Sequence, residues 1–309
     1  MFNKINTKVL WGMFAVLLLA AVYVLFLNKG EERSFRKELV TIDTSKVSEI
    51  FIYPKDKKEE IHLIKEGDNW KLKISADKLV PVPKSKVINI LNELVKIEPT
   101  VLAARDNSKW HEFQVDSTGI QVKVLENGKQ TLNIIIGRIA FQRPNTVSTY
   151  VRLDNDVNVY KTDGYAGMSF NRSANDFRDN NIISGNKSDW NRLTFQYPAD
   201  SSFILVHDGK RWSIGNTITD SAKTAQLLNN LEHVVSTDYA DNFAPGNFRK
   251  PDYKLFIEKN DTTNIQVEAY LDSSRIILHS SQNPESYFTG TKNLNNRIFL
   301  SAKRFLTKK

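Results

Sequence analysis

Histidines and oxygen-bearing side chains are the residues of this sequence best suited to chemistry. The five histidines are His62, His111, His207, His233 and His279. No two of them stand at the spacing of a metal-ligand pair such as H-x-H or H-E-x-x-H. The sequence therefore predicts no metal site built on histidine.

The run Asp154-Asn155-Asp156-Val157-Asn158 places oxygen atoms at alternate positions, as the first half of a calcium-binding loop does. The sixth position of such a loop requires Gly for its sharp turn, and here it is Val159. The twelfth position requires Glu, and here it is Tyr165. We interpret the run as a polar hairpin between two strands and predict no metal and no cofactor.

The sequence lacks the usual motifs of nucleophilic catalysis and of nucleotide binding. The chain contains no Cys, no G-x-S-x-G, no G-x-x-x-x-G-K-[ST] and no G-x-G-x-x-G. We therefore predict a protein that is not an enzyme and has no catalytic residue. The alternative is a hydrolase whose His and carboxylate groups converge from distant segments into one pocket.

An internal repeat organises the chain, because the same landmarks recur in the same order. Each copy begins with Phe-Arg, continues to a strand ending in Tyr-Pro, and then reaches a Trp after a polar turn. The landmarks are Phe35, Arg36, Tyr53 and Trp70 in the first copy and Phe177, Arg178, Tyr197 and Trp212 in the second.

A helix is expected next in each copy, over KSKVINILNELVKI (84–97) and SAKTAQLLNNLEHV (221–234). Apolar residues at helical spacing predict the buried stripes. These are Val87, Ile88, Leu91, Leu94 and Val95 in the first helix and Ala225, Leu227, Leu228, Leu231 and Val234 in the second.

Further strands complete each copy, and residues 113–137 match residues 253–280. In this match Ile120-Gln121-Val122 aligns with Ile265-Gln266-Val267, and residues 149–160 align with 286–300. Alternating apolar residues and a single principal helix per copy favour an α+β class, with the helix packed on a mainly antiparallel sheet. The expected domains are 29–163 and 177–309, joined by a linker at 164–176.

Two pairs of landmarks have expected structural roles. Arg36 and Arg178 either cover a neighbouring Phe with their alkyl stems or form a bidentate pair with an acid of the opposite copy, and we favour the pair over a ligand-binding role. Trp70 and Trp212 are expected to anchor each helix to its sheet.

Two loops, 138–148 and 164–176, combine aromatic residues, Met and Arg, as protein interfaces do. The candidate interface residues are Phe141, Arg143, Tyr165, Met168 and Phe170. The alternatives are ordinary connectors with inward aromatics and, for the second loop, a hinge between the copies.

The segment Val9–Leu27 holds nineteen residues without a charge, a strong amide or Pro. As a helix it would extend about 28 Å, close to the hydrocarbon thickness of a bilayer. We expect an uncleaved signal-anchor within residues 1–28, the alternative being a cleaved signal peptide. A short head and a large body favour a cytoplasmic N-terminus and a periplasmic body in the bacterial inner membrane.

The formal net charge is +8, but acids are interleaved with the bases, as in KDKKEE and KEGDNWKLK. No basic stripe with interleaved aromatic residues is present, so no nucleic-acid partner is expected.

Several stretches together resemble the bacterial family called domain of unknown function 4340. They are FRKELVTIDTSKVSEIFI, GDNWKL, LNELVKI, LNIIIG and TYVRLDNDVNVY in the first copy, and DFRDNNII and GKRWSI in the second. Members of that family commonly carry an N-terminal transmembrane helix, and some are encoded near, or fused to, ABC-type transport components related to gliding-motility transporters. The resemblance implies an accessory role in the envelope beside an ABC-type transporter subunit, and it implies no catalytic residue. The alternative function is a solute- or glycan-binding module that uses the groove between the repeats.

Overall fold

The computed structural model describes residues 36–55, 59–142, 146–246, 249–259, 264–272 and 275–306, together with Trp11, Phe14 and residues 16–18. The predictions for Phe35, Arg143 and most of Val9–Leu27 therefore lie outside the described residues. Trp11, Phe14 and residues 16–18 are helical and their side chains are exposed. Within the described ranges, no helix is both long and apolar enough to cross a membrane.

The first repeat is built on a nine-stranded antiparallel sheet in the order β4-β3-β2-β1-β6-β7-β8-β9-β5. The strands are β1 Val47–Tyr53, β2 Ile61–Glu66, β3 Asn69–Ser75, β4 Lys78–Val82, β5 Pro99–Ala104, β6 Ile120–Glu126, β7 Lys129–Gln142, β8 Thr146–Leu153 and β9 Val159–Asp163. The helices are α2 Lys84–Val95, α3 Trp110–Phe113 and α4 Ala166–Ser169, with 3₁₀ turns η1 Asn107–Lys109 and η2 Ala174–Phe177.

The second repeat is built on an eight-stranded antiparallel sheet in the order β14-β13-β12-β11-β16-β17-β18-β19, beside a two-stranded sheet of β10 and β15. The strands are β10 Asn181–Ser184, β11 Trp190–Gln196, β12 Phe203–His207, β13 Trp212–Ile214, β14 Thr217–Ile218, β15 His233–Val235, β16 Tyr253–Lys259, β17 Asn264–Asp272, β18 Arg275–Ser280 and β19 Asn283–Gly290. The helices are α5 Ser221–Leu231 and α6 Lys292–Ile298, with 3₁₀ turns η3 Lys187–Asp189, η4 Ala199–Ser201 and η5 Ala302–Arg304.

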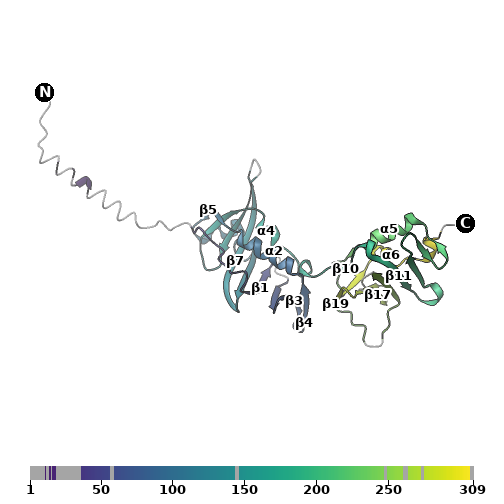
Figure 1. Cartoon of the computed structure of the whole chain (residues 1–309). Coiled ribbons are helices and arrows are strands. Elements are labelled where there is room, and N and C mark those ends of the chain that lie inside the picture. The colour runs from purple at the N-terminus through teal and green to yellow at the C-terminus, as the bar shows by residue number, and fades with distance from the viewer. Residues whose placement is uncertain are drawn as a thin grey trace, which may run out of the picture.

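The two sheets share one topology. Each strand from β1 to β4 and from β6 to β9 has a counterpart at the same place in the second sheet, β11 to β14 and β16 to β19. The principal helix follows the fourth strand of each copy, α2 after β4 and α5 after β14. The prediction of an α+β chain with two similar, sheet-rich repeats is confirmed, and Figure 1 shows them as two separate bodies.

The alignment of Ile120–Val122 with Ile265–Val267 is wrong by one strand. The first triplet lies in β6, which pairs with β1, whereas the second lies in β17, which pairs with β16. The match of residues 149–160 with 286–300 has the same error, because the counterpart of β8 is β18. Adjacent amphipathic strands repeat one two-residue pattern, so their sequences alone do not distinguish one strand from the next.

Alternation of buried and exposed residues gives each repeat its own core. Ile50 and Ile52 of β1 are completely buried in the first core, and Leu193 and Phe195 of β11 are completely buried in the second. On α2 the expected stripe is correct at Val87, Leu91 and Leu94, which are buried together with Ile90.

Ile88 and Val95 are corrections to that stripe, because 44% and 45% of their surfaces are exposed. On α5 the expected Ala225 is exposed in the same way, and Thr224 is buried in its place. In both helices the buried face is therefore turned by one residue from the expected face, which the 3.6-residue period permits when apolar residues stand side by side.

Each repeat ends with the motif S-A-x-x-F, residues 173–177 and 301–305. Phe177 is 1% exposed in the first core, and Phe305 is 0% exposed in the second. Phe177, expected to open the second repeat, thus contributes its side chain to the first, and Ile182 is the first residue of the second core.

Candidate functional site

Strand β7 carries Phe141 beyond the rest of the sheet. The strand pairs with β6 as far as Ile136, and after a bulge its residues from Ile139 onward pair with β8 alone. Phe141 lies opposite Val147 near the end of this extension, where β9 pairs with the other side of β8 at Ser148, and 75% of the surface of Phe141 is exposed. The bulge places Gly137 where an added Cβ atom would lie 2.2 Å from the carbonyl oxygen of Phe113, so only glycine fits.

Tyr165 and Met168 lie at the same end of the first repeat. The amide of Gly164 donates a hydrogen bond of 2.9 Å to the carbonyl of Val147, the residue opposite Phe141. Helix α4 follows at once and packs on β7. Tyr165 is 51% exposed and Met168 is 62% exposed. We call Phe141, Tyr165 and Met168 the hairpin patch.

Two of the five candidate interface residues fall outside this patch. Phe170 is completely buried in the first core, so it is unavailable to a partner and its assignment is wrong. The reason is the short helix α4, which turns the chain back toward α2 and directs Phe170 inward. Arg143 lies outside the described residues.

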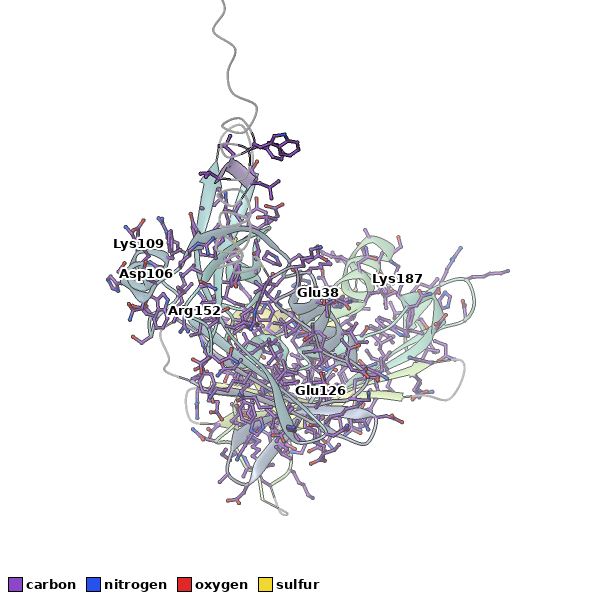
Figure 2. All side chains as sticks on the ribbon, turned by 90° about the vertical axis from the view of Figure 1, so that its left-hand side faces the viewer. Glu38, Asp106, Lys109, Glu126, Arg152 and Lys187 are labelled. Atoms are coloured by element: carbon purple, nitrogen blue, oxygen red, sulfur yellow. The ribbon has the colours of Figure 1, made fainter. Side chains whose placement is uncertain are left out.

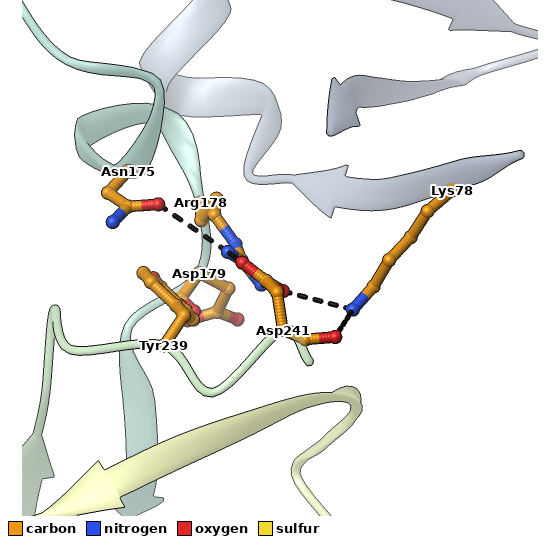
Figure 3. A network of polar contacts seen from close by, with 6 residues as sticks. All are labelled: Lys78, Asn175, Arg178, Asp179, Tyr239 and Asp241. Carbon is orange, nitrogen blue, oxygen red and sulfur yellow. Dashed lines mark hydrogen bonds and ion pairs between the residues drawn. The ribbon is translucent and has the colours of Figure 1, made fainter. Parts of the chain in front are cut away.

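Arg178 joins the two repeats. Its guanidinium is 1% exposed and forms two hydrogen bonds to Asp241, from Nη1 to Oδ2 at 2.7 Å and from Nη2 to Oδ1 at 3.0 Å. Its Cζ atom lies 3.5 Å from the ring centre of Tyr239. Figure 3 shows Asp241 between Arg178 and Lys78, which reaches over from β4 and lies 3.0 Å from Oδ1 of the same carboxylate. The carboxylate therefore receives one cation from each repeat.

This arrangement changes the acidity of Asp241 and Tyr239. Burial raises the pKa of Asp241, but the hydrogen bonds from Arg178 and Lys78 outweigh burial and leave the pKa below its ordinary value. Burial raises the pKa of Tyr239 to about 12, even though the charge of Arg178 acts in the opposite direction. At neutral pH the junction therefore holds an ionised carboxylate, two cations and a neutral phenol.

Arg178 forms a bidentate pair, but with Asp241 of its own repeat and not with an acid of the opposite copy as expected, and Arg36 forms no such pair. The acid that pairs with Arg178 belongs to the second repeat, and the first repeat contributes Lys78 rather than the carboxylate. Arg36 is 51% exposed and lies 3.8 Å from Asp156 of its own repeat. The difference follows from position, because Arg178 stands where the two repeats meet.

The longer β3–β4 hairpin of the first repeat explains why Lys78 reaches the second repeat. Trp70 pairs with Val82, and the hairpin between them carries Lys78 next to its turn. The counterpart Trp212 accepts a hydrogen bond from the amide of Thr219, which is much nearer in the chain. Lys86 of α2 adds a second connection, donating to the carbonyls of Asp176 at 2.8 Å and Arg178 at 2.7 Å.

An inter-repeat groove of about 470 Å³ adjoins the junction. Its polar lining comes from Glu59, Glu60, Lys73, Ser173, Asn175 and Asp241. Among the described residues no aromatic side chain lines the groove, so it offers no ring on which a sugar could stack. The observation does not favour a glycan site between the repeats.

A polar cluster that the sequence analysis missed lies on one face of the second sheet. Glu268 accepts hydrogen bonds from Tyr270 at 2.9 Å and Gln266 at 2.8 Å, and lies 3.2 Å from Lys254 and 3.7 Å from His279. Burial raises the pKa of Glu268, but these hydrogen bonds and Lys254 lower it overall. A carboxylate so fully occupied is a weak proton acceptor, so the cluster is suited to structure rather than catalysis. Strand alternation, with Glu268, Tyr270 and His279 on one face, is the signal that could have found it.

The remaining landmarks lie in or near the cores. Trp70 is 5% exposed in the first core, whereas Trp212 is only partly buried against the second. The hydroxyl of Tyr53 donates to Glu60 at 2.8 Å, and that of Tyr197 donates to the carbonyl of Leu300 at 2.8 Å. Figure 2 shows Arg152 beside the segment that bears Asp106 and Lys109, and its Cζ atom lies 3.8 Å from the ring centre of Trp110 in that segment.

The polar run at residues 154–158 forms the turn between β8 and β9, as predicted. Arg152 donates to the carbonyls of Leu153, Asp154 and Asp156 at 3.0, 3.0 and 3.1 Å, so these oxygens face a cation. Across the described ranges, no three His, Asp or Glu side chains come together in a way that could hold a metal ion.

Comparison with known proteins gives one match. No curated protein and no solved structure matches the chain. The family model described as "Domain of unknown function (DUF4340)" matches residues 70–255, from Trp70 of β3 across the Arg178 junction to Leu255 of β16. Because this segment is more than half of the 309 residues, the chain belongs to the DUF4340 family.

Proposed function

We propose that this protein is a non-enzymatic, membrane-anchored scaffold of the bacterial envelope, which binds a membrane-protein partner through the hairpin patch. The partner we propose is a subunit of an ABC-type transport system. The apolar segment Val9–Leu27 would hold the protein in the inner membrane, with the N-terminus in the cytoplasm and both repeats in the periplasm.

The hairpin patch is the observation that carries this proposal. Phe141, Tyr165 and Met168 are large side chains of types enriched at protein interfaces, and each is more than half exposed. Phe141 belongs to β7, and Tyr165 and Met168 belong to the N-cap and body of α4, which packs on β7. A patch held on a sheet in this way loses little conformational entropy when a partner binds.

The contacts around Asp241 support the proposal of a scaffold whose two repeats keep one relative orientation. Arg178 is buried and pairs with Asp241, and separating the repeats would expose Asp241 and remove Lys78 from it. Separation would also break the hydrogen bond of 2.7 Å that Lys86 of α2 donates to the carbonyl of Arg178. The two repeats would therefore present their surfaces to a partner in one fixed relation.

A crosslinking pull-down of the full-length protein from its native membrane tests the proposal. The test variants are Phe141→Asp and Met168→Asp, which place a charge in the patch without entering the core. The matched control is Leu271→Asp in the second repeat, where an apolar side chain is 45% exposed. We expect the wild type and the control to capture an ABC-type transport subunit, and both patch variants to lose it. Equal capture by all four proteins, or capture by none, would refute the proposal.

A further inference from the structure

The second repeat contains an apolar pocket beside its principal helix. It lies between α5 and the hairpin of β13 and β14 and has a volume of about 370 Å³. The lining includes Trp212, Ile218, Thr219, Thr224, Ala225 and Leu228, with Lys210 and Arg211 at its edge. We call this the Trp212 pocket. Its size suits one or two large side chains.

The first repeat serves as an internal comparison, because one of the matching positions there carries a larger side chain. The counterparts, matched through the helices and the strand partners of the two Trp residues, are Val82 for Thr219, Val87 for Thr224 and Ile88 for Ala225. Trp70 is 5% exposed in that packing, whereas Trp212 is only partly buried. Valine and threonine are similar in size, so the two repeats differ here by Ala225 in place of an isoleucine and by the shorter hairpin of the second repeat.

The hydroxyl groups of the two threonines in the pocket already have hydrogen-bond acceptors within the protein. The hydroxyl of Thr219 donates to the carbonyl of Trp212 at 3.0 Å, and that of Thr224 donates to the carbonyl of Asp220 at 2.8 Å. With these hydroxyls bonded, the rest of the pocket lining apart from the two cations is the indole ring, the short side chain of Ser221, and the apolar Ile218, Ala225 and Leu228. An apolar side chain is the group that would gain most by entering it.

Among the strands that the structure describes, β14 forms an edge of its sheet beside the pocket. Strand β14 is the last strand of its sheet, and Ile218 is 53% exposed. The amide of Thr219 donates to Trp212, so the alternation of an antiparallel ladder directs the amide and carbonyl of Ile218 away from β13. An extended peptide can bond to such an edge while its side chains enter a neighbouring pocket.

The positive charges at the pocket indicate which kind of peptide would bind there. Lys210 and Arg211 line the pocket, no carboxylate lines it, and neither cation has an ion-pair partner among the described residues. A second copy of this chain, with its net charge of +8, is a poor occupant for such a site. We propose that the Trp212 pocket and the edge of β14 bind an extended acidic peptide of a partner protein, which inserts one apolar side chain beside Trp212.

A peptide-binding measurement on the full-length protein in nanodiscs of zwitterionic lipid tests this proposal. The probe is a fluorescein-labelled nonapeptide with a central leucine flanked by threonine and aspartate residues. The comparison peptide has lysine in place of each aspartate. We expect fluorescence polarisation to show binding of the acidic peptide that is at least about tenfold tighter than that of the basic peptide.

Ala225→Ile is the decisive variant, because it gives the pocket the isoleucine of the first repeat, where Ile88 is exposed and well accommodated. We expect it to weaken binding of the acidic peptide by about tenfold, and we expect the double variant Lys210→Glu, Arg211→Glu to weaken it similarly. The matched control Ile88→Ala should bind as the wild type does. Unchanged binding by Ala225→Ile, equal binding of the two peptides, or binding of neither would overturn the proposal.

Discussion

Phe177 and Phe305 occupy equivalent positions, each closing the core of the repeat that precedes it in the chain. Both follow a Ser-Ala pair in a 3₁₀ turn, and their exposed fractions are 1% and 0%. Arg178 comes directly after Phe177, so the residue that completes the first core also places the guanidinium that pairs with Asp241. The end of one repeat and its connection to the next are therefore one structural feature.

Phe177→Ala should destabilise the first repeat, although its sequence resembles the start of the second. Removing a fully buried phenyl ring costs about 3–5 kcal/mol. In hydrogen-exchange measurements we expect lower protection in β3 and α2, whose core Phe177 joins, and a smaller change in β11.

Phe305→Ala is the matched variant and should lower hydrogen-exchange protection in the second repeat instead of the first. Its ring lies 6.1 Å from that of Phe203 in the second core, so protection should fall in β11 and β12. If Phe177→Ala instead lowered protection mainly in β11 and β12, the assignment of Phe177 to the first core would be incorrect.

Asp241→Ala should cost about 3–5 kcal/mol of unfolding free energy, because it leaves the buried Arg178 without its carboxylate. Lys78→Ala should cost less than about 1 kcal/mol, since Lys78 is 36% exposed and water can replace its partner. Chemical denaturation of the two variants provides the comparison. Similar losses for both would show that the contact with Lys78, and not the buried Arg178, accounts for the cost.

Acid should lower the free energy of unfolding, because it protonates Asp241 at the junction. Its pKa in the folded protein is below the ordinary value, so the unfolded chain takes up the proton first as the pH falls. The stability contributed by the ionised carboxylate is complete above the unfolded pKa of about 3.9 and is lost as the pH falls through the folded pKa.

Denaturation curves recorded between about pH 6 and pH 2.5 can isolate this effect. Asp241→Asn lacks the titrating group, and the other carboxylates contribute equally to both proteins. We expect the unfolding free energy of the wild type to fall more steeply with acid than that of the variant. Parallel curves would exclude a lowered pKa for Asp241.

Gly137→Ala should disturb the segment that supports the hairpin patch. An added Cβ atom would approach the carbonyl of Phe113 to 2.2 Å and a methyl carbon of Val115 to 2.7 Å, so the segment must move, at a cost of about 1–3 kcal/mol. We expect a change in the fluorescence of Trp110, whose indole nitrogen donates to the carbonyl of Val157 at 3.0 Å.

Gly128→Ala is the control for backbone strain alone. Gly128 has φ of +79° with no atom within 4 Å of an added Cβ, so alanine there should cost about 1–2 kcal/mol without moving Trp110. An unchanged Trp110 spectrum in Gly137→Ala would contradict the close approach at the bulge.

The sequence by itself determined the duplication, the two principal helices and the α+β class. Those features depend on local spacing: the polar turn before each Trp, the apolar period of α2 and α5, and the two-residue alternation of the strands. The cap of α5 is local in the same way, since the side chain of Asp220 accepts a hydrogen bond from the amide of Lys223 at 3.0 Å. Local patterns suffice for these because neighbouring residues form them.

Only the tertiary structure decided which strand of one repeat matches which strand of the other, that Phe177 and Phe170 pack inward, and that Arg178 pairs with Asp241. Each of these depends on residues far apart in the chain. Amphipathic strands with one period are interchangeable in sequence, and a Phe between two cores can enter either. The pairing of strands and the packing within each repeat resolve such choices, because each core is filled by residues that come together from distant parts of the chain.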